Sequence, residues 1–438
     1  MTEMSKTKPI PYCLRETDDD GPTTMKVDVP NFGPRYKWSD FNKKQIIFAY
    51  YYGILNISPV SGILIEAVGP KYIVVCSVFF TGLLNILIVQ GAKWHWTVTF
   101  CCRFATGIAS GLIYPSLILL MARWAPPNER GKFASALLGH TIGTAFIWVY
   151  INYTIPKLGW QASFYVNTIL VMVYCIAFFF LTSSSPEQHK FISPEELEHI
   201  KKSQGPFISI KKEMPPYGEI LSSCSCFALA ILQFGDRWLD QMNIFVVPTY
   251  MNDFVGVDTD ASALLTVLPL LFEYLGAVIF ANLTDIIAAK NTISVTALTK
   301  MFVVVSHLVP GMIILCTGLT QCVMGASAIL LVLSNFFGGA VVVTNLRIPV
   351  DMAPNFSATI FSLHSVLSST SGLIVPSLSE VVIGDANDVI HWAILFAVGG
   401  LVLISTGIIY IFFGSSEIQY WNVKRGRPLR LRRNDEET

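Results

Sequence analysis

The stretch GILIEAVGPK (62–71) joins two strongly apolar runs, and ANLTDIIAAK (281–290) joins two apolar runs in the second half of the chain. Both stretches contain a small residue, three further positions, an acidic residue, four further positions and a lysine. A second pair, RWAPPNER (123–130) and PVDMAPNF (349–356), follows in the same order. Two matched pairs, separated by about half the chain, predict a protein with two duplicated halves.

Composition places these halves in a membrane. Of the 438 residues, 53% are hydrophobic and only 14% are charged, whereas a soluble domain has about 25% charged residues. Apolar runs of roughly 20 residues span a bilayer as helices, because the backbone must satisfy its own hydrogen bonds there. The nine cysteines lack zinc-ligand spacing and are interpreted as small hydrophobic residues. We find no nucleotide-binding loop, catalytic elbow or basic patch for nucleic acid, and therefore predict no enzyme.

The apolar runs predict an all-α polytopic membrane protein with eleven spans. A polar segment at 1–42, expected to be disordered, precedes an N-terminal bundle of five spans at 43–183. A central loop at 184–217, a C-terminal bundle of six spans at 218–415 and a basic tail at 416–438 follow. The predicted spans are 45–68, 72–93, 97–122, 133–155, 162–182, 225–250, 262–286, 297–317, 323–347, 356–380 and 390–413.

Basic residues orient the chain. The central loop, the 123–132 connection and the tail are rich in Lys and Arg, while the alternate loops are acidic. The positive-inside rule therefore places the central loop and the tail in the cytosol.

The repeated stretch is then a tight cytosolic hairpin. The acids Glu66 and Asp285 can accept hydrogen bonds from the N-terminus of a neighbouring helix, while Lys71 and Lys290 lie at the cytosolic surface. Such a contact would hold the two halves together on this face and release them when it opens. The alternative is an ordinary charged loop.

Several motifs resemble solute carrier family 17 of the major facilitator superfamily, which includes sialin, vesicular glutamate transporters and sodium–phosphate cotransporters. They are WAPPNER (124–130), SPEQHKFIS (185–193), PTYM (248–251), DMAP (351–354) and FFGSSEIQYWN (412–422). The resemblance implies two six-helix bundles and alternating-access transport of an organic anion or phosphate. It also implies coupling to H⁺, Na⁺ or membrane potential, in a plasma membrane or a lysosomal or vesicular membrane.

The third span carries the first candidate substrate residues. Arg103, Gly107, Ser110 and Tyr114 recur at helical spacing, so small and polar side chains share a face with one guanidinium. Intramembrane charges are costly and are functional candidates, and a guanidinium offers a fork to carboxylate or phosphate. The resemblance implies that Arg103 contacts the anion. The alternative is a structural Arg103 that is paired to a carboxylate.

The family also has glutamates at the positions of Thr106 and Ser110, and the vesicular glutamate transporters have a histidine at that of Ile47. Proton coupling by that route is therefore not expected.

The second half adds further candidates. Polar residues cluster at three- and four-residue spacing on a helix face that we expect to line water: Gln233, Asp236, Arg237, Asp240, Gln241 and Asn243. Of this span, Asp236, Arg237 and Trp238 are candidate substrate residues. The family's arginine occupies the position of Asp236, and a shift of one residue turns a helix by about 100°, which could direct Arg237 away from the cavity. Trp238 matches the family. Glu273 is an intramembrane acid that could couple transport to an ion or pair with a base.

One expected helix is missing. FGPRY (32–36) resembles the stretch before the family's first helix, and KWSD (37–40) the stretch before its second. Their direct junction predicts a splice form or an incomplete gene model. It leaves the N-terminus, with eight Lys and Arg by residue 44, on the outer side, against the positive-inside preference. Such a form is expected to fold poorly or not to transport.

The sequence therefore predicts a secondary active symporter of the major facilitator fold, with the usual first helix missing. The expected partners are a small anion and the lipid bilayer, and we expect a monomer without nucleic acid, resident cofactor or metal site. H⁺ or Na⁺ would be the coupling ion. The alternative function is a transport-inactive membrane protein that binds a ligand or partner, and a seven-helix receptor does not fit the span count.

Overall fold

The structure is a computed structural model that describes residues 5–9, 11–14, 24–28, 32–204, 214–256, 259–290, 292–384 and 388–422. Part of the predicted central loop, 205–213, and most of the predicted basic tail, 423–438, lie outside the described residues.

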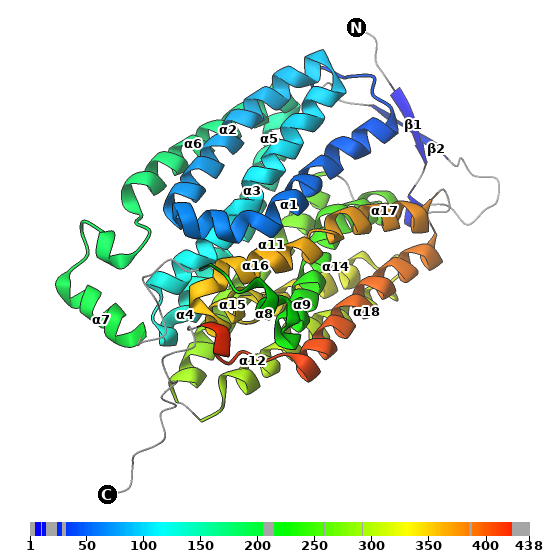
Figure 1. Cartoon of the computed structure of the whole chain (residues 1–438). Helices are drawn as coiled ribbons and strands as arrows, with labels where there is room; N and C mark the ends of the chain where they lie inside the picture. The colour runs from blue at the N-terminus through cyan, green and yellow to red at the C-terminus, as the bar shows by residue number, and fades with distance from the viewer. Residues whose placement is uncertain are drawn as a thin grey trace, which may run out of the picture.

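The N-terminal bundle contains five long helical spans, and Figure 1 shows how they lie beside one another. Ser39 caps the first of them by accepting a hydrogen bond from the Asn42 amide. Gly69 has a φ of 107° between the first two helices, and Pro70 opens the second. This backbone favours glycine, and proline suits the first position of a helix, so the chain reverses there within one residue. The helices are α1 (Asp40–Val68), α2 (Pro70–Trp94), α3 (Trp96–Trp124), α4 (Arg130–Leu137), α5 (His140–Leu158) and α6 (Trp160–Leu181).

The C-terminal bundle contains six spans, and several include π-helical turns. The surface helix α7 (Pro194–Gln204) and the short α8 (Tyr217–Ser222) precede it. Its helices are α9 (Cys224–Gln241), α10 (Val247–Thr249), α11 (Thr259–Ala289), α12 (Val295–Val303), α13 (Val309–Thr317), α14 (Met324–Gly338), α15 (Ile348–Met352), α16 (Ser357–Ser368), α17 (Ser371–Ile383) and α18 (Val389–Phe413). The π-helical turns are Met242–Val246, Tyr250–Val255, Val304–Leu308 and Val342–Leu346.

The structure confirms the predicted membrane architecture. Ten helical segments among the described residues are long and apolar enough to cross a bilayer. The eleventh predicted span is the helical segment from Cys224 to Val255, which carries the charged residues Asp236, Arg237 and Asp240. Because of these charges, the segment is less apolar than the other ten. Charged residues inside a membrane are candidates for function, so this helix is a candidate position for the site.

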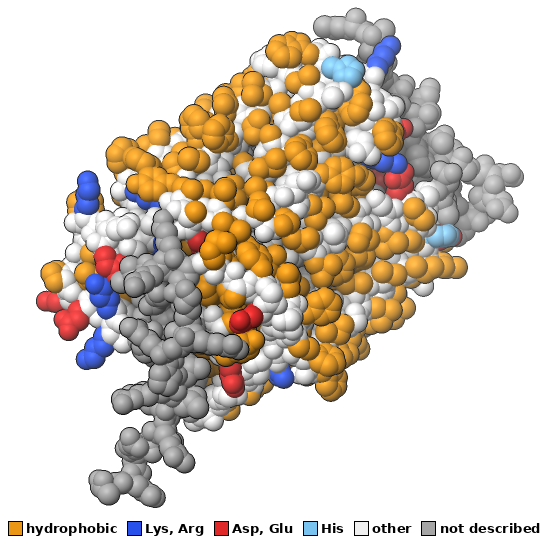
Figure 2. Space-filling model, viewed as in Figure 1, with side chains coloured by type: hydrophobic (Ala, Val, Ile, Leu, Met, Phe, Trp, Pro, Cys, Tyr) orange, Lys and Arg blue, Asp and Glu red, His pale blue; other side chains and the backbone are white. Residues whose placement is uncertain are grey.

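The two ends of the molecule differ. α7 lies at one end and the strands β1 (Ser5–Pro9) and β2 (Thr24–Asp28) at the other (Figure 1). Between them, hydrophobic side chains cover the visible face, while charged side chains gather toward the ends (Figure 2). Apolar surface of this extent is not tolerated in water, and the chain is therefore a multi-pass integral membrane protein.

The missing helix leaves a face uncovered. In the C-terminal bundle, α9 packs against α16 and α18, whereas the described part of the N-terminal bundle has no counterpart of α9. α6 is the last helix of the N-terminal bundle, and α18 is the last helix of the C-terminal bundle. In the most apolar stretch of each helix, 11% of the residues are buried in α6 and 44% in α18. The described N-terminal bundle thus has counterparts for five of the six spans of the C-terminal bundle.

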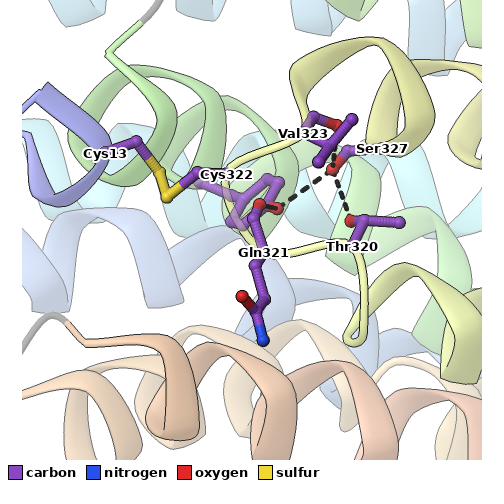
Figure 3. The surroundings of a disulfide bond; sticks show 7 residues. Cys13, Thr320, Gln321, Cys322, Val323 and Ser327 are labelled. Atoms are coloured by element: carbon purple, nitrogen blue, oxygen red, sulfur yellow. Dashed lines mark hydrogen bonds between the residues drawn. A yellow bond between two sulfur atoms is a disulfide. The ribbon is translucent and has the colours of Figure 1, made fainter.

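The N-terminal segment is more ordered than expected. β1 (Ser5–Pro9) pairs antiparallel with β2 (Thr24–Asp28), and a 3₁₀ turn, Tyr12–Leu14, lies between them in the chain. Cys13 forms a disulfide with Cys322 (Figure 3). The Tyr12 ring stacks on Phe254 at 5.3 Å between centroids. The expected disorder was therefore wrong for these residues, because a link across 309 residues cannot be read from local composition.

The cysteine interpretation is corrected at the same two positions. Cys102, Cys175 and Cys226 are buried thiols, in keeping with use as small hydrophobic residues. Cys13 and Cys322 are instead covalently paired. Disulfides persist in oxidising compartments, so this pair fits the outer side that the orientation argument gives to the loop between α13 and α14.

The residues around the Tyr36–Lys37 junction dock on the N-terminal bundle. The Trp160 amide donates to the Phe32 carbonyl at 2.9 Å, and the Trp160 indole N–H donates to the Pro34 carbonyl at 3.0 Å. The N-terminal segment thus contacts the C-terminal bundle through Cys13 and the N-terminal bundle through residues 32–34.

We expect the Cys13–Cys322 disulfide to join the two halves of a cleaved chain. A protease site inserted between residues 205 and 213 would separate Cys13 from Cys322. On denaturing gels without reductant the two fragments should migrate together, and with reductant they should separate. Cys13→Ser should abolish the linkage, while replacement of the exposed free Cys76 by Ser should not. Fragments that separate without reductant would contradict the pairing and its oxidising location.

Candidate functional site

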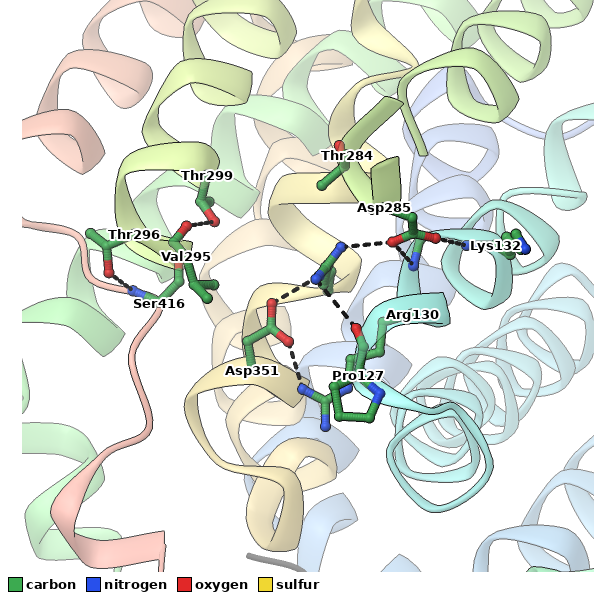
Figure 4. Close-up of polar contacts among 12 residues, drawn as sticks. Pro127, Arg130, Lys132, Thr284, Asp285, Val295, Thr296, Thr299, Asp351 and Ser416 are labelled. Atoms are coloured by element: carbon green, nitrogen blue, oxygen red, sulfur yellow. Dashed lines mark hydrogen bonds and ion pairs between the residues drawn. The ribbon is translucent and has the colours of Figure 1, made fainter. Parts of the chain in front are cut away.

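A buried ionic network joins the two bundles at the cytosolic end (Figure 4). Arg130 of the N-terminal half donates to Asp351 of the C-terminal half at 2.6 Å. Arg347 donates from Nε to Asp351 at 2.9 Å and from Nη1 to Asp285 at 3.0 Å. All four side chains are buried, and a buried network of this kind is strongly destabilised when one partner is removed.

Asp285 also accepts two backbone hydrogen bonds from the other half. The amides of Gly131 and Lys132, in the first turn of α4, donate to its two carboxylate oxygens at 3.1 and 3.2 Å. These are orphan N–H groups at a helix N-terminus, where the helix dipole also favours an anion. The structure therefore places Asp285 against a neighbouring helix N-terminus, as the repeated stretch suggested.

The equivalent acid of the first half makes a related but weaker contact. Glu66 on α1 accepts a hydrogen bond from the Thr359 hydroxyl, in the first turn of α16, at 2.9 Å. Gly62 permits this approach, because a Cβ there would lie 2.4 Å from the Thr359 hydroxyl oxygen. The two acids of the repeated hairpins thus each touch the opposite bundle.

The two lysines of the repeat do not take part. Lys71 lies over the Phe179 ring at 5.0 Å, and Lys290 is exposed at the end of α11. Within the described residues, neither lysine forms an ion pair or hydrogen bond with the opposite bundle.

A polar cavity of about 310 Å³ lies between the bundles, nearer the middle of the membrane. Glu273 lines it and Asp285 lies twelve residues further along α11, or about 18 Å at 1.5 Å per residue. The network therefore closes the cytosolic side below the cavity. The wall includes Tyr50 and Tyr51 of α1, Ser110 and Tyr114 of α3, His140 of α5, Arg237, Asp240 and Gln241 of α9, and serines of α16 and α17.

Arg237 occupies the centre of this wall. It donates to Asp240 at 2.8 Å, and its guanidinium lies 5.5 Å from the centroid of the Tyr114 ring. Tyr114 in turn lies 2.7 Å from His140 Nδ1. The cavity thus presents one guanidinium and several hydroxyl groups, which can bind the oxygens of an anion.

A second contact joins the bundles beside Arg237. The Tyr51 hydroxyl donates to the Gln241 side-chain oxygen at 2.6 Å. Because α1 and α9 belong to different bundles, this hydrogen bond must break if the bundles separate on the cavity side.

Acids outnumber bases around the cavity. Asp236, Asp240 and Glu273 interact electrostatically with one another and with Arg237. Arg237 pairs with Asp240, and within the described residues neither Asp236 nor Glu273 forms an ion pair. Two acids therefore lack a basic partner in a region of low dielectric, which requires a proton or a cation to compensate them.

Some of the predicted substrate residues line the cavity and others do not. Ser110, Tyr114 and Arg237 line the cavity. Arg103 is partly buried and does not line the cavity. Its charge interacts with the hydroxyl groups of Tyr50 and Tyr51, and both of these tyrosines line the cavity. Within the described residues no carboxylate pairs with Arg103, so its guanidinium lies one layer behind the cavity with its charge uncompensated.

One expectation for α9 needs correction. Trp238 is buried in the apolar core of the C-terminal bundle and does not line the cavity. Arg237, which was proposed as a substrate residue despite the one-residue shift, lines the cavity. Adjacent residues point about 100° apart on a helix, and here Arg237 points to the cavity while Trp238 points into the core. Asp236 lies beside the wall, next to Asn345.

Several wall residues were missed. Tyr50, Tyr51 and His140 were not proposed as site residues, and neither were Ser365, Ser368, Ser369 and Ser371. The small polar run SVLSSTSG (365–372) in an otherwise apolar span could have indicated a water-facing surface.

Known proteins share this fold and this arrangement of two bundles. The sequence model of the Major Facilitator Superfamily matches residues 29–376, and the chain belongs to that family. Solved structures with a similar fold include the proton:xylose symporter XylE bound to 6-bromo-6-deoxy-D-glucose. It superposes with a TM-score of 0.66 at 10% sequence identity, and the match covers 87% of this chain and 89% of that chain. A bacterial homologue of the iron transporter ferroportin, in an outward-facing state, gives a TM-score of 0.61 at 14% identity over 84% of this chain and 89% of that one.

Sequence relatives narrow the resemblance. Sodium-dependent phosphate transport protein 1 of Oryctolagus cuniculus is 25% identical over 89% of this chain and 83% of its own length. Human sialin is 22% identical over 91% of this chain and 80% of its own length. The predicted resemblance to the sialin and sodium–phosphate cotransporter type is therefore confirmed, and proteins of this superfamily are transporters and not enzymes.

Proposed function

We propose that this protein is a secondary active transporter that moves a small anion, either phosphate or an organic anion, by alternating access. The observation that carries the proposal is the pair of guanidinium groups on opposite bundles: Arg237 lines the cavity, and Arg103 lies behind Tyr50 and Tyr51. Phosphate and carboxylate are the ligands that match guanidinium geometry. The names of the phosphate and sialin relatives support the same substrate class.

The cytosolic network gives a physical basis for alternation. It holds one face closed through contacts that all cross from one bundle to the other. We propose that Glu66 and Asp285 act as gating residues there, and that Glu273 exchanges a proton or interacts with a coupling cation. Its burial among Asp236, Asp240 and Arg237 supports this role.

The alternative is a membrane protein that binds ligand or partner without transporting. The uncovered α6 favours it, because a bundle that lacks one of six helices is poorly supported. Binding without uptake would identify this case.

Arg103→Ala is expected to reduce anion uptake to about a thirtieth, because Arg103 is a positive charge without a carboxylate partner behind the cavity wall, and its attraction to an anion in the cavity is worth about 2 kcal/mol. Uptake of labelled phosphate and small carboxylates into proteoliposomes measures the effect. Imposed Na⁺ and H⁺ gradients identify the coupling ion in the same assay.

Two controls accompany this experiment. Lys93→Ala removes a positive charge from the same bundle away from the cavity, where Lys93 donates to the Gln90 side chain at 3.1 Å, and should retain uptake. Arg103→Lys keeps the charge but loses the fork. Unchanged uptake and apparent affinity in Arg103→Ala would show that Arg103 is structural, and no uptake by the parent chain under any gradient would refute the transport proposal.

A further inference from the structure

The residues that follow α18 fold back onto the cytosolic end of the C-terminal bundle. The Ser416 amide donates to the Thr296 hydroxyl group at 3.1 Å (Figure 4), and the Ser416 hydroxyl group lies 3.0 Å from that of Tyr410. Ser416, Trp421 and Asn422 are exposed by only 1%, 6% and 2%. Ordering a polar stretch after the end of a span costs conformational entropy, so its burial indicates a role for the contacts that it makes.

These contacts reach the turn that follows Asp351. The turn comprises residues 352–356, between α15 and α16, and the Gln419 amide donates to its first carbonyl group, that of Met352, at 2.8 Å. The Asn355 amide donates to the Asn422 side-chain oxygen at 3.2 Å, and the Asn355 side chain donates to the Asn422 carbonyl at 2.9 Å. Three hydrogen bonds thus hold the turn against the segment after α18.

The turn depends on this support. α15 contains only five residues, Ile348–Met352, and Ala353 leaves the helical conformation with φ −153° and ψ 86°. The last carbonyl groups of a helix have no partner within it, and a helix this short is not stable by its own hydrogen bonds. Asp351 belongs to α15 and accepts from Arg130 of the opposite bundle at 2.6 Å. Residues 419–422 therefore fix the segment from which Asp351 meets Arg130.

The segment after α18 has a counterpart in the first half of the chain. SSPEQ (184–188) follows α6, and SSEIQ (415–419) follows α18. Both stretches contain two adjacent serines and a glutamine three positions after the second serine. This third matched pair appears in the order that the duplicated halves require.

The counterpart makes an equivalent contact. The Trp124 indole N–H donates to the Ser183 carbonyl at 3.1 Å, and the Trp124 ring lies 5.5 Å from the His189 ring. Trp124 belongs to the repeated stretch that ends at Arg130, just as the turn at 352–356 belongs to the stretch that contains Asp351. Each half therefore docks the segment after its last helix on the stretch that carries one partner of the ion pair between the bundles.

We propose that Asn422 is a positioning residue for the cytosolic network, which holds Asp351 in place for its contact with Arg130. The Arg130–Asp351 ion pair crosses from one bundle to the other, so it exists only while the cytosolic face is closed. A turn that shifts when Asn422 loses its hydrogen bond moves Asp351 away from Arg130 and lowers the closed population. The effect on alternation rests on the proposed transport function, but the effect on the distance between the bundles does not.

Distances between spin labels on the full chain test this role. Lys132→Cys and Lys290→Cys place one label on each bundle at the cytosolic face, in a background without the exposed free cysteines. Asn422→Leu keeps a similar volume but removes the oxygen that binds the Asn355 amide. It should raise the ratio of long to short distances about 5-fold, as expected for the loss of one hydrogen bond.

Two further variants make the result specific. Gln419→Ala removes a side chain that donates to the Glu417 carbonyl but keeps the backbone hydrogen bond to Met352, and it should leave the distances unchanged. Asn355→Ala removes the donor to the Asn422 carbonyl and should reproduce the shift of Asn422→Leu. Because it leaves residues 419–422 intact, it tests the same contact if Asn422→Leu does not fold.

A combination with Arg130→Ala separates positioning from a general loss of packing. In this background Arg347 still pairs with Asp285, so a closed population remains to be measured. If Asn422 acts through the Arg130–Asp351 contact, Asn422→Leu should add less than about 2-fold to the ratio there, because residues that act through one contact are not additive.

Additive shifts, or unchanged distances in both Asn422→Leu and Asn355→Ala, would overturn the proposal. The measurement needs no substrate. A parent chain that shows these shifts without anion uptake would keep the positioning role and refute the transport function, and uptake with unchanged distances would do the reverse.

Discussion

Replacing Arg237 by Ala is expected to reduce anion uptake by at least about 100-fold, as measured by initial rates in proteoliposomes with matched protein content. Arg237 is the guanidinium at the cavity wall, and it is held by Asp240 and lies over Tyr114. Its removal deletes the charge that an anion would bind and also leaves Asp240 without its partner. Loss of a buried charged partner costs about 3–5 kcal/mol, so both binding and folding would suffer.

A second variant separates these two effects. The double variant Arg237→Ala with Asp240→Asn removes the charge pair together, and should recover a normal yield of folded protein. It should still fail to transport, because no guanidinium remains at the wall. Arg237→Lys keeps the charge without the bidentate fork and should retain partial uptake. Uptake by the double variant at the rate of the parent chain would show that Arg237 does not bind the substrate.

Arg347→Ala is expected to open the cytosolic face. Arg347 is the only one of the four network residues that pairs with both Asp285 and Asp351, so its loss leaves two carboxylates with fewer partners in a buried position. A cost of about 3 kcal/mol for an uncompensated buried charge would shift the closed-to-open ratio roughly 100-fold. Separation of the bundles would rehydrate both acids and relieve that cost.

Distance measurements between spin labels report this shift. Lys132→Cys and Lys290→Cys place labels on exposed cytosolic positions of the two bundles, in a background without the exposed free cysteines. Longer distances should become populated in Arg347→Ala. Lys93→Ala serves as the control, since Lys93 donates to Gln90 of its own helix at 3.1 Å and lies at the end of α2 away from the cytosolic hairpin. An unchanged distance distribution would mean that the network does not hold this face closed.

Local sequence determined the membrane architecture. Apolar runs specify spanning helices, because every backbone group in lipid must pair within its own segment. The repeated hairpins indicated two halves, and the acids Glu66 and Asp285 within them indeed lie where the bundles meet. These features depend on composition and short spacing, which a single sequence displays directly. The prediction that an omitted first helix explains the Tyr36–Lys37 junction stays a prediction.

Tertiary packing decided the rest. Arg130 and Asp351 are 221 residues apart, and Cys13 and Cys322 are 309 apart, so only the folded chain brings them together. Packing likewise decided between the two predicted site residues Arg237 and Trp238: adjacent helical residues differ by about 100°, and the neighbours of α9 determine that Arg237 meets the cavity and Trp238 enters the core. Sequence spacing gives the relative directions of side chains on a helix, but the absolute rotation of that helix is set by the contacts that the other helices make with it.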